Sequence, residues 1–288
     1  MKVIIPVAGQ GTRMLPLTKS LPKEMLPLYN KPIIQHIIFE CVMAGFKEII
    51  LVSSPDKLSI ESFFNDAHPT HQRINTKSEM GLACDIDALD YQISVVYQTE
   101  PLGLGHAILC AEPLVGQNDF AVVLPDVVLT RDHPSYQTTA LKQMRQSFVL
   151  TKQSQIMIHE VDPKEVINYG IVGLDGQSTS EIGQLIEKPS IDEAPSNLAV
   201  LGRYILGREI WHHLRQTDPD CRGEIQLTTA LMQLLQHEPM SAFLTEDKVF
   251  DCGQMAGYAA AFIQFTLQSR GQRDNTAKVT MPKINAMN

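Results

Sequence analysis

The sequence is poor in cysteine, in positive charge and in long apolar runs, and each shortage excludes a class of protein. Its 5 cysteines among 288 residues are odd in number and far apart, so they form neither a disulfide framework nor a CxxC motif. Lysine and arginine total 24 against 32 aspartates and glutamates, a net charge of −8, which predicts no nucleic-acid or anionic-membrane partner. An anionic ligand must therefore be held by a local site.

No apolar run is long enough to cross a membrane. The first run, residues 3–7, is short, contains Pro6 and is followed by Gly9 and Gly11, so we expect no targeting segment and a cytoplasmic protein. The chain is 44% hydrophobic and shows no linker-like stretch, which predicts one domain with a sizeable core over residues 1–270. We expect residues 271–288 to form a terminal helix or a tail.

The order of apolar patterns predicts an α/β fold. A buried strand at 3–7, a helix at 33–44 and a strand at 48–53 form a βαβ unit, which implies a parallel sheet with a right-handed crossover. Further strands are expected at 93–97, 121–124, 155–159, 170–174, 184–187 and 199–206, and helices at 106–111, 210–215, 227–235 and 257–268. The second half is therefore more α+β than the first.

A glycine loop follows the first strand, where parallel sheets often bind phosphate. It runs from Ala8 through Gly9 and Gly11 to Thr12. The dinucleotide fingerprint would need glycine in place of Met14, and the Walker pattern is also absent. Neither standard phosphate-binding motif applies.

Three cations follow within eleven residues: Arg13, Lys19 and Lys23. Prolines 16, 22 and 27 prevent an ordinary helix there, so the cations are held in an irregular segment that suits the several charges of a triphosphate. The alternative is a solvated basic turn.

Two aspartates stand where a metal could be held. Asp126 directly follows an expected strand, and Asp251 begins a tight turn at residues 251–253. Mg²⁺ is commonly bound by one or two carboxylates plus substrate phosphates, so this pair suffices if the fold brings the two together. Taken singly, each aspartate is better explained as a turn or cap residue.

Other polar groups follow strands as well. Lys188 can bind a phosphate monoester and Glu187 can accept from sugar hydroxyls, although a surface ion pair is the simpler alternative. The Gln98 amide matches the hydrogen-bonding edge of uracil, and Gly103 and Gly105 would admit a close base, although a glycine turn that starts a helix explains them too.

The run from Gly9 to Leu28 resembles the signature of bacterial UTP–glucose-1-phosphate uridylyltransferases, the UDP-glucose pyrophosphorylases of the sugar-phosphate nucleotidyltransferase family. The resemblance continues at residues 98–107, 124–127, 168–170, 187–189, 194–204, 223–228 and 251–253. It implies a Rossmann-like, mostly parallel sheet flanked by helices, with a nucleotide-binding part at about 1–130 and a smaller α+β sugar-phosphate part at about 150–255. Between Phe64 and Ile93 the chain is shorter than the usual family member, and we hypothesise an altered lid or subunit contact.

The resemblance also implies roles for single residues. Lys188 would meet the phosphate of glucose 1-phosphate, Glu187 the glucose hydroxyls and Gly170 the sugar ring, with Asn168 and Tyr169 as weaker candidates. Uracil recognition falls to Gln98, Gly103 and the backbone of Ala8 and Gly9, with Glu24 contributing. Arg13 is assigned to the β- and γ-phosphates, Lys23 to the α-phosphate with Lys19 assisting, and Asp126 and Asp251 to Mg²⁺.

The implied reaction makes UDP-glucose and pyrophosphate from UTP and glucose 1-phosphate in a homodimer or homotetramer. The alternatives are a sister enzyme that uses dTTP or another sugar 1-phosphate, and a non-catalytic regulatory paralogue. Two further features are read as structural: the pair His68 and His71 as a solvated loop, and Cys252 as a buried apolar residue.

Overall fold

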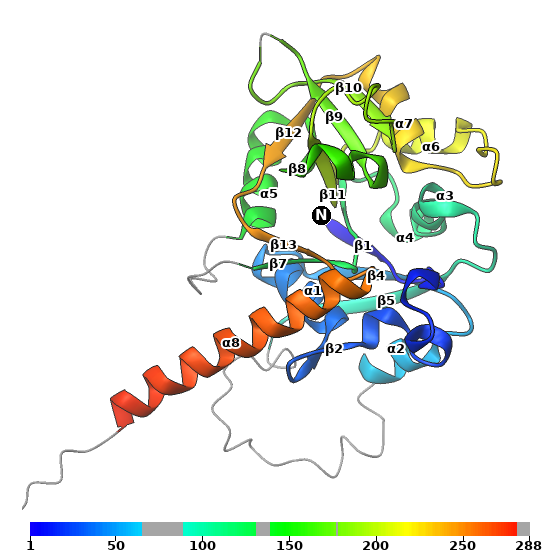
Figure 1. Cartoon of the computed structure of the whole chain (residues 1–288). Helices are drawn as coiled ribbons and strands as arrows, with labels where there is room; N and C mark the ends of the chain where they lie inside the picture. The colour runs from blue at the N-terminus through cyan, green and yellow to red at the C-terminus, as the bar shows by residue number, and fades with distance from the viewer. Residues whose placement is uncertain (65–88, 131–138, 177, 281–288) are drawn as a thin grey trace, which may run out of the picture.

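A nine-stranded mixed sheet forms the centre of the computed structural model, which describes residues 1–64, 89–130, 139–176 and 178–280, with side chains as far as 269 (Figure 1). Its main path runs β10 (Ile182–Glu187), β9 (Gly170–Leu174), β11 (Leu198–Leu206), β6 (Phe120–Val123), β1 (Lys2–Pro6), β4 (Glu48–Ser53) and β5 (Gln92–Tyr97). Strand β8 (Ser154–Glu160) pairs with β11 and carries β12 (Met240–Leu244).

The two halves of the sheet differ in strand direction, which confirms the predicted fold class. Strands β6, β1, β4 and β5 pair in parallel, as the βαβ pattern predicts. Strand β11 pairs antiparallel with β6, β8 and β9, and β9 with β10. The parallel half positions loops at one common edge, and the antiparallel half extends the same sheet beyond it.

Alternation along the central strands produces a three-layer structure. Val3 and Ile5 of β1 belong to one buried cluster, and Ile4 between them belongs to the other. The first cluster includes α1 (Ile33–Met43), α5 (Ala140–Thr151) and the start of α8 (Met255–Thr280), and the second includes α3 (Gly103–Cys110), α6 (Ile210–Gln216) and α7 (Leu227–Leu235). Helices therefore cover both faces of the sheet.

Some elements escape the sequence pattern. Helices α2 (Leu58–Phe64), α4 (Glu112–Val115) and α5 are present without having been predicted, as are the short strands β2 (Pro27–Leu28), β3 (Lys31–Pro32), β7 (Val127–Thr130), β12 and β13 (Lys248–Asp251). The strands of 2 to 5 residues are too short for a periodicity to register. Half of the residues of helix α5 are polar, and its buried residues Ala140, Leu141, Met144 and Phe148 lie on one face.

The C-terminal segment is helical as far as Thr280, and α8 extends away from the body of the molecule (Figure 1).

Within the described residues, no helix combines the length and the apolar character that crossing a membrane requires. His68, His71 and most of the shortened segment between Phe64 and Ile93 lie outside the described residues.

Candidate active site

The candidate site lies where the parallel strands end. Because β6, β1, β4 and β5 are parallel neighbours, the residues that follow them emerge at one edge of the sheet. In that order they are Asp126, the glycine loop that begins at Ala8, Lys57 and Gln98. The strand order thus places the expected metal ligand on one side of the loop and the expected base-recognition residue on the other.

A second, two-stranded sheet brings the two aspartates together. Strands β7 and β13 pair antiparallel with Val127 opposite Asp251, and the Cys252 N–H donates to the Asp126 carbonyl oxygen at 2.7 Å. At Gly253, a Cβ atom would lie 2.9 Å from Asp251 Oδ1 and 3.0 Å from Asp126 Oδ2. The carboxylates of Asp126 and Asp251, which are 125 positions apart in sequence, therefore lie around the same position. Residue 253 fits there only as glycine, because a Cβ atom would come too close to both carboxylates.

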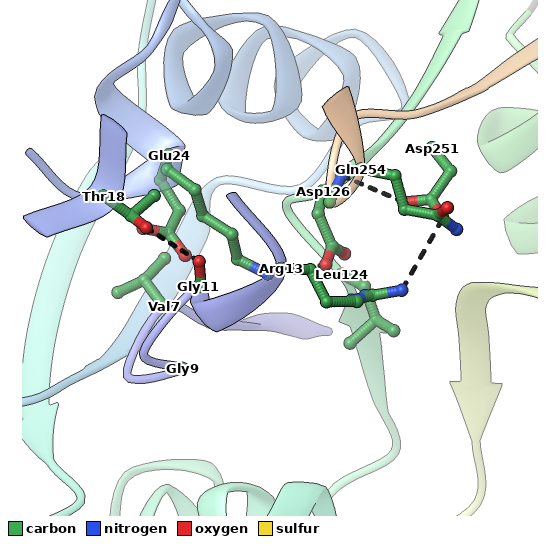
Figure 2. A network of polar contacts seen from close by, with 12 residues as sticks. Val7, Gly9, Gly11, Arg13, Thr18, Glu24, Leu124, Asp126, Asp251 and Gln254 are labelled. Carbon is green, nitrogen blue, oxygen red and sulfur yellow. Dashed lines mark hydrogen bonds and ion pairs between the residues drawn. The ribbon is translucent and has the colours of Figure 1, made fainter. Parts of the chain in front are cut away.

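Arg13 reaches the same point. Its Nη2 lies 3.0 Å from that Cβ position at Gly253, and its Nη1 lies 3.9 Å from Asp251 Oδ2. Figure 2 shows Arg13, Asp126 and Asp251 directed toward one another from three separate segments. One guanidinium and two carboxylates therefore converge at this position.

Lys23 and Asp126 form a largely buried ion pair, with Nζ 2.6 Å from Oδ2. Burial by itself lowers the pKa of Lys23, but the charges of Asp126 and Glu24 outweigh it and raise that pKa overall. Burial likewise raises the pKa of Asp126, whereas Lys23 and then Arg13 bring it below its ordinary value. Both groups are charged at neutral pH.

Glu24 lies beneath the glycine loop and is 1% exposed. Its Oε2 accepts from Lys57 Nζ at 2.9 Å, and its Oε1 is buried with no hydrogen-bond partner among the described residues. Burial raises the pKa of Glu24, and Lys57 and then Lys23 oppose that rise. The side chain thus keeps one acceptor oxygen without a partner from the described chain.

A buried arginine braces the turn that carries Asp126. Arg203 of β11 is fully buried, and its guanidinium donates to Glu40 Oε1 and Oε2 at 3.1 and 2.8 Å. It also donates to the carbonyl oxygens of Leu124 and Val127 at 2.9 and 2.7 Å. These two carbonyls flank Asp126, so the guanidinium fixes the backbone on both sides of that carboxylate.

The predicted sugar-phosphate residues come together across β9 and β10, where Gly170 pairs with Glu187. A Cβ at Gly170 would lie 3.2 Å from Glu187 Oε2, which accepts from Thr228 Oγ1 at 2.7 Å. Lys188 adopts a left-handed φ of 46°, and its Nζ lies 3.5 Å from Glu187 Oε1. The strained backbone turns Lys188 out of the strand at a half-exposed position.

Two tyrosines relate this region to the strand-end residues. Burial raises the pKa of Tyr204, and the charges of Glu187 and Asp126 raise it further. The pKa of Tyr169 is raised by burial and then by Asp251. The Tyr169 carbonyl accepts from the Lys188 N–H at 2.9 Å, whereas the Asn168 amide donates to Glu165. Tyr204 is thus affected by a carboxylate from each region, Glu187 and Asp126.

Gln98 is buried at the other end of the site. Its Nε2 donates to the Gly103 carbonyl oxygen and lies 3.0 Å from His106 Nδ1. A Cβ at Gly103 or Gly105 would lie 2.8 Å from the Ile225 carbonyl oxygen. Close packing on residue 225 therefore already requires glycine at both positions, whether or not a ligand approaches.

The remaining residues of the predicted loop differ in how they are held. Gly11 has a φ of 66°, which favours glycine, and its carbonyl oxygen accepts from Thr18 Oγ1 at 2.8 Å. Thr12 and Lys19 are exposed. Cys252 is buried and its thiol has a pKa raised by burial to about 12, as a structural cysteine should.

Sequence reasoning missed Lys57, Arg203 and Thr228 as parts of the site. Lys57 follows the strand at 48–53, so the strand-end rule that selected Asp126 would also have found it. Arg203 is a charge within the apolar run 199–206, which signals a buried, paired cation. Thr228 carries no such signal.

The carboxylate pair fits Mg²⁺. Among the residues that the structure describes, no group of three or more His, Cys, Asp or Glu could hold a metal. Asp126 Oδ2 and Asp251 Oδ1 supply hard oxygen atoms around the Cβ position of Gly253, and Asp126 already pairs with one positive charge, the Lys23 ammonium. Mg²⁺ takes this kind of partial protein site when phosphate oxygens and water complete its shell.

Residues 2–268 match the family described as nucleotidyl transferase, so the chain belongs to the nucleotidyl transferase family. Within it the chain belongs to the UTP–glucose-1-phosphate uridylyltransferases. The protein of that name from Haemophilus ducreyi is 42% identical over 93% of this chain and 94% of its own length, and that of Escherichia coli is 41% identical over 96% and 91%.

Solved structures agree with this assignment. A UTP-bound UGPase from Acinetobacter baumannii has a TM-score of 0.83 at 35% identity and covers 98% of this chain and 99% of its own. A UDP-glucose pyrophosphorylase complexed with UDP-glucose has a TM-score of 0.79 at 36% identity, covering 93% and 98%. The fold predicted from the sequence is that of these proteins.

Proposed function

We propose that this protein transfers the uridylyl group of UTP to glucose 1-phosphate, giving UDP-glucose and pyrophosphate. The observation that carries the proposal is the convergence of Arg13, Asp126 and Asp251 at the Cβ position of Gly253, beside the Lys23 ammonium. Such a set can bind polyphosphate and compensate the charge that moves during phosphoryl transfer. Relatives that share 42% and 41% of their residues with this chain carry the name of this activity.

In the proposed reaction, a phosphate oxygen of glucose 1-phosphate attacks the α-phosphorus of UTP in line. The new P–O bond forms as the bond between the α-phosphorus and the bridging oxygen to the β-phosphate breaks, and pyrophosphate leaves with that bonding pair. One phosphoanhydride replaces another, so no enzyme nucleophile is needed, in agreement with the protonated thiol of Cys252. The protein's task is positioning and charge compensation.

The cations divide this task. Arg13 binds the β- and γ-phosphates and Lys23 the α-phosphate, with the exposed Lys19 assisting. Lys188 holds the attacking phosphate. Asp126 and Asp251 would hold Mg²⁺, which when bound supplies positive charge to the phosphate oxygens and orients them.

Uracil recognition falls to the far end of the site. The unpartnered Glu24 Oε1 suits the N3–H of uracil, since a buried acceptor needs a donor. The Gln98 amide, the backbone of Ala8 and Gly9 and the segment at Gly103 complete this pocket. On the opposite side, Gly170 and Glu187 receive the sugar. The nucleotide and sugar parts are thus proposed to divide one domain between them.

A substrate matrix tests the proposal. Pyrophosphate release is measured with UTP or dTTP against glucose or galactose 1-phosphate, with Mg²⁺ present. We expect UTP with glucose 1-phosphate to give the highest kcat/KM. A preference for dTTP would overturn the assignment in favour of a sister enzyme, and no turnover with any pair would favour a regulatory paralogue.

The assembly and the location complete the proposal. A homodimer or homotetramer acting in the cytoplasm remains our prediction, and light scattering coupled to size-exclusion chromatography measures the first part of it. A purely monomeric species at micromolar concentration would contradict the predicted assembly.

A further inference from the structure

Lys57 occupies a place in the site where a phosphate-binding lysine would be expected. It lies four residues beyond β4, next to the glycine loop, and its side chain is 12% exposed. Its ammonium, however, already meets three acceptors: the carbonyl oxygens of Val7 and Gly9 at 2.6 and 2.5 Å, and Glu24 Oε2 at 2.9 Å. An ammonium has three hydrogens, so none remains for a ligand.

The two carbonyl contacts orient the loop. Each peptide unit is planar and trans, so the N–H of the next residue points away from the carbonyl that Lys57 holds. Holding Val7 C=O therefore turns the Ala8 N–H away from Lys57, and holding Gly9 C=O does the same for Gln10. Neither amide donates to an acceptor in the described part of the chain. Both are left as donors for a ligand.

The third contact acts on Glu24. By binding Oε2, Lys57 fixes the carboxylate and leaves Oε1 without a hydrogen-bond partner among the described residues. Burial lowers the pKa of Lys57 and raises that of Glu24, and each partner's charge opposes the shift of the other. Without Lys57 the buried carboxylate would tend to take up a proton and lose its acceptor character.

We propose that Lys57 is a positioning residue that presets the uridine pocket, holding the Ala8 and Gln10 amides and the Glu24 acceptor in their binding orientation without touching the nucleotide. The inference rests on the proposed function for the identity of the ligand. It predicts a selective defect, because the hydrogen bonds of Lys57 within the described residues go to Val7, Gly9 and Glu24 and none goes to β9 or β10. UTP binding should weaken while binding of glucose 1-phosphate is unchanged.

The test compares Lys57→Met with Lys47→Met, which removes a lysine just before the same strand where it pairs at the surface with Asp90. We expect Lys57→Met to raise the Kd of UTP, measured by calorimetry, and the KM of UTP at least tenfold. Its KM for glucose 1-phosphate should stay within about twofold of the wild-type value, and Lys47→Met should match the wild type throughout. An unchanged Kd for UTP in Lys57→Met would overturn the proposal.

A second pair of variants separates positioning from simple stabilisation, since Lys57→Met leaves a buried carboxylate unpaired. Glu24→Gln removes that charge, and Lys57→Met is then added to it. We expect the double variant to keep the melting temperature of Glu24→Gln but to bind UTP several-fold more weakly, because the loop carbonyls have lost their donor. Equal UTP affinities in the two variants would contradict the role in orienting the loop.

The loop can also be observed without nucleotide. ¹⁵N relaxation of the Ala8 to Gly11 amides should show greater mobility in Lys57→Met than in Lys47→Met. Equal mobility in the two variants would refute the proposal that Lys57 holds the glycine loop, whatever the ligand is. If the wild-type loop is rigid but the protein does not bind UTP, the proposed function is refuted, whereas the positioning role of Lys57 is not.

Discussion

Two regions of the site use the same residue types for opposite purposes. The pocket rim consists of Arg13, Lys23 and Lys188, and the support layer beneath it consists of Lys57 and Arg203. In the described chain, Lys23 donates to one acceptor, and Arg13 and Lys188 make only ion pairs of 3.9 and 3.5 Å. Lys57 and Arg203 meet three and four acceptor atoms.

The difference lies in how many donors remain, and charge alone does not reveal it. A rim cation keeps N–H groups that can donate to a phosphate. A support cation donates its N–H groups to backbone carbonyl oxygens, and these hydrogen bonds fix the segments that carry the binding groups. Arg203 supports the Asp126 turn and Lys57 supports the glycine loop. Substitutions in the rim should therefore change chemistry, and substitutions in the support layer should change stability or shape.

The largest effect is expected at Arg203. Arg203→Met leaves Glu40 and two carbonyl oxygens without their donor, which should cost about 3–5 kcal/mol of unfolding free energy. The double variant Arg203→Met, Glu40→Met should recover much of this loss, because no uncompensated charge stays buried. Urea unfolding measures both. A single variant as stable as the wild type would remove Arg203 from the support layer.

Asp126→Asn should lower turnover by two to three orders of magnitude, about 3–4 kcal/mol in the activation barrier, while the fold persists. The carboxylate is lost from the proposed metal site, but the turn stays braced by Arg203. Steady-state kinetics across a Mg²⁺ series, with circular dichroism as the folding control, measure the effect. Near-normal activity at ordinary Mg²⁺ would exclude Asp126 from the mechanism.

The ion pair of Lys23 and Asp126 predicts a pH dependence. The folded-state pKa of Asp126 is below its ordinary value of 3.8, so its contribution to stability is present above that value and is lost as the pH falls through the lowered pKa. In the Lys23→Met variant, the burial of Asp126 is no longer offset by Lys23 and raises the pKa of Asp126. The free energy of unfolding of the variant should therefore increase as the pH falls toward 3.8. The stability deficit of the variant should therefore shrink from neutral pH to about pH 3.

Urea midpoints of the wild type and Lys23→Met across this range give the comparison. A deficit that widens on acidification would mean that the pair does not set the charge of Asp126.

The smallest effect is expected at the surface pair of Lys47 and Asp90, whose side chains are 70% and 85% exposed. A double-mutant cycle on these two residues should give a coupling of about 0–1 kcal/mol. A coupling as large as that of Arg203 and Glu40 would show that acceptor count and burial do not distinguish the support layer from the surface.

Local patterns predicted much of this molecule. The βαβ unit at the N-terminus, the strand at 170–174 and the helix at 227–235 follow from apolar periodicity and stop signals within a few residues. The strand-end rule placed Asp126 at the correct edge of the sheet. It also applied to Lys57, which was overlooked because a lone lysine in a turn carries no motif.

The rest depended on distant contacts. No local signal predicts that β7 pairs with β13, yet this pairing places Asp251 beside Asp126. Nor does the sequence show why position 253 requires glycine, because a Cβ there would lie within 3.0 Å of charged groups from three separate segments. Such contacts depend on how distant segments of the chain are connected and packed, which a short stretch of sequence cannot predict.

By itself the sequence determined the fold class and the phosphate-loop edge, because periodicity and strand-end position act within about ten residues. The roles of the candidate residues came from the resemblance of its motifs to a known family. Only the tertiary structure decided which cations keep free donors and which are saturated. That distinction depends on acceptors as far apart in sequence as Glu40 and Val127 around Arg203, because a fully buried guanidinium needs hydrogen-bond partners that only the folded chain brings together.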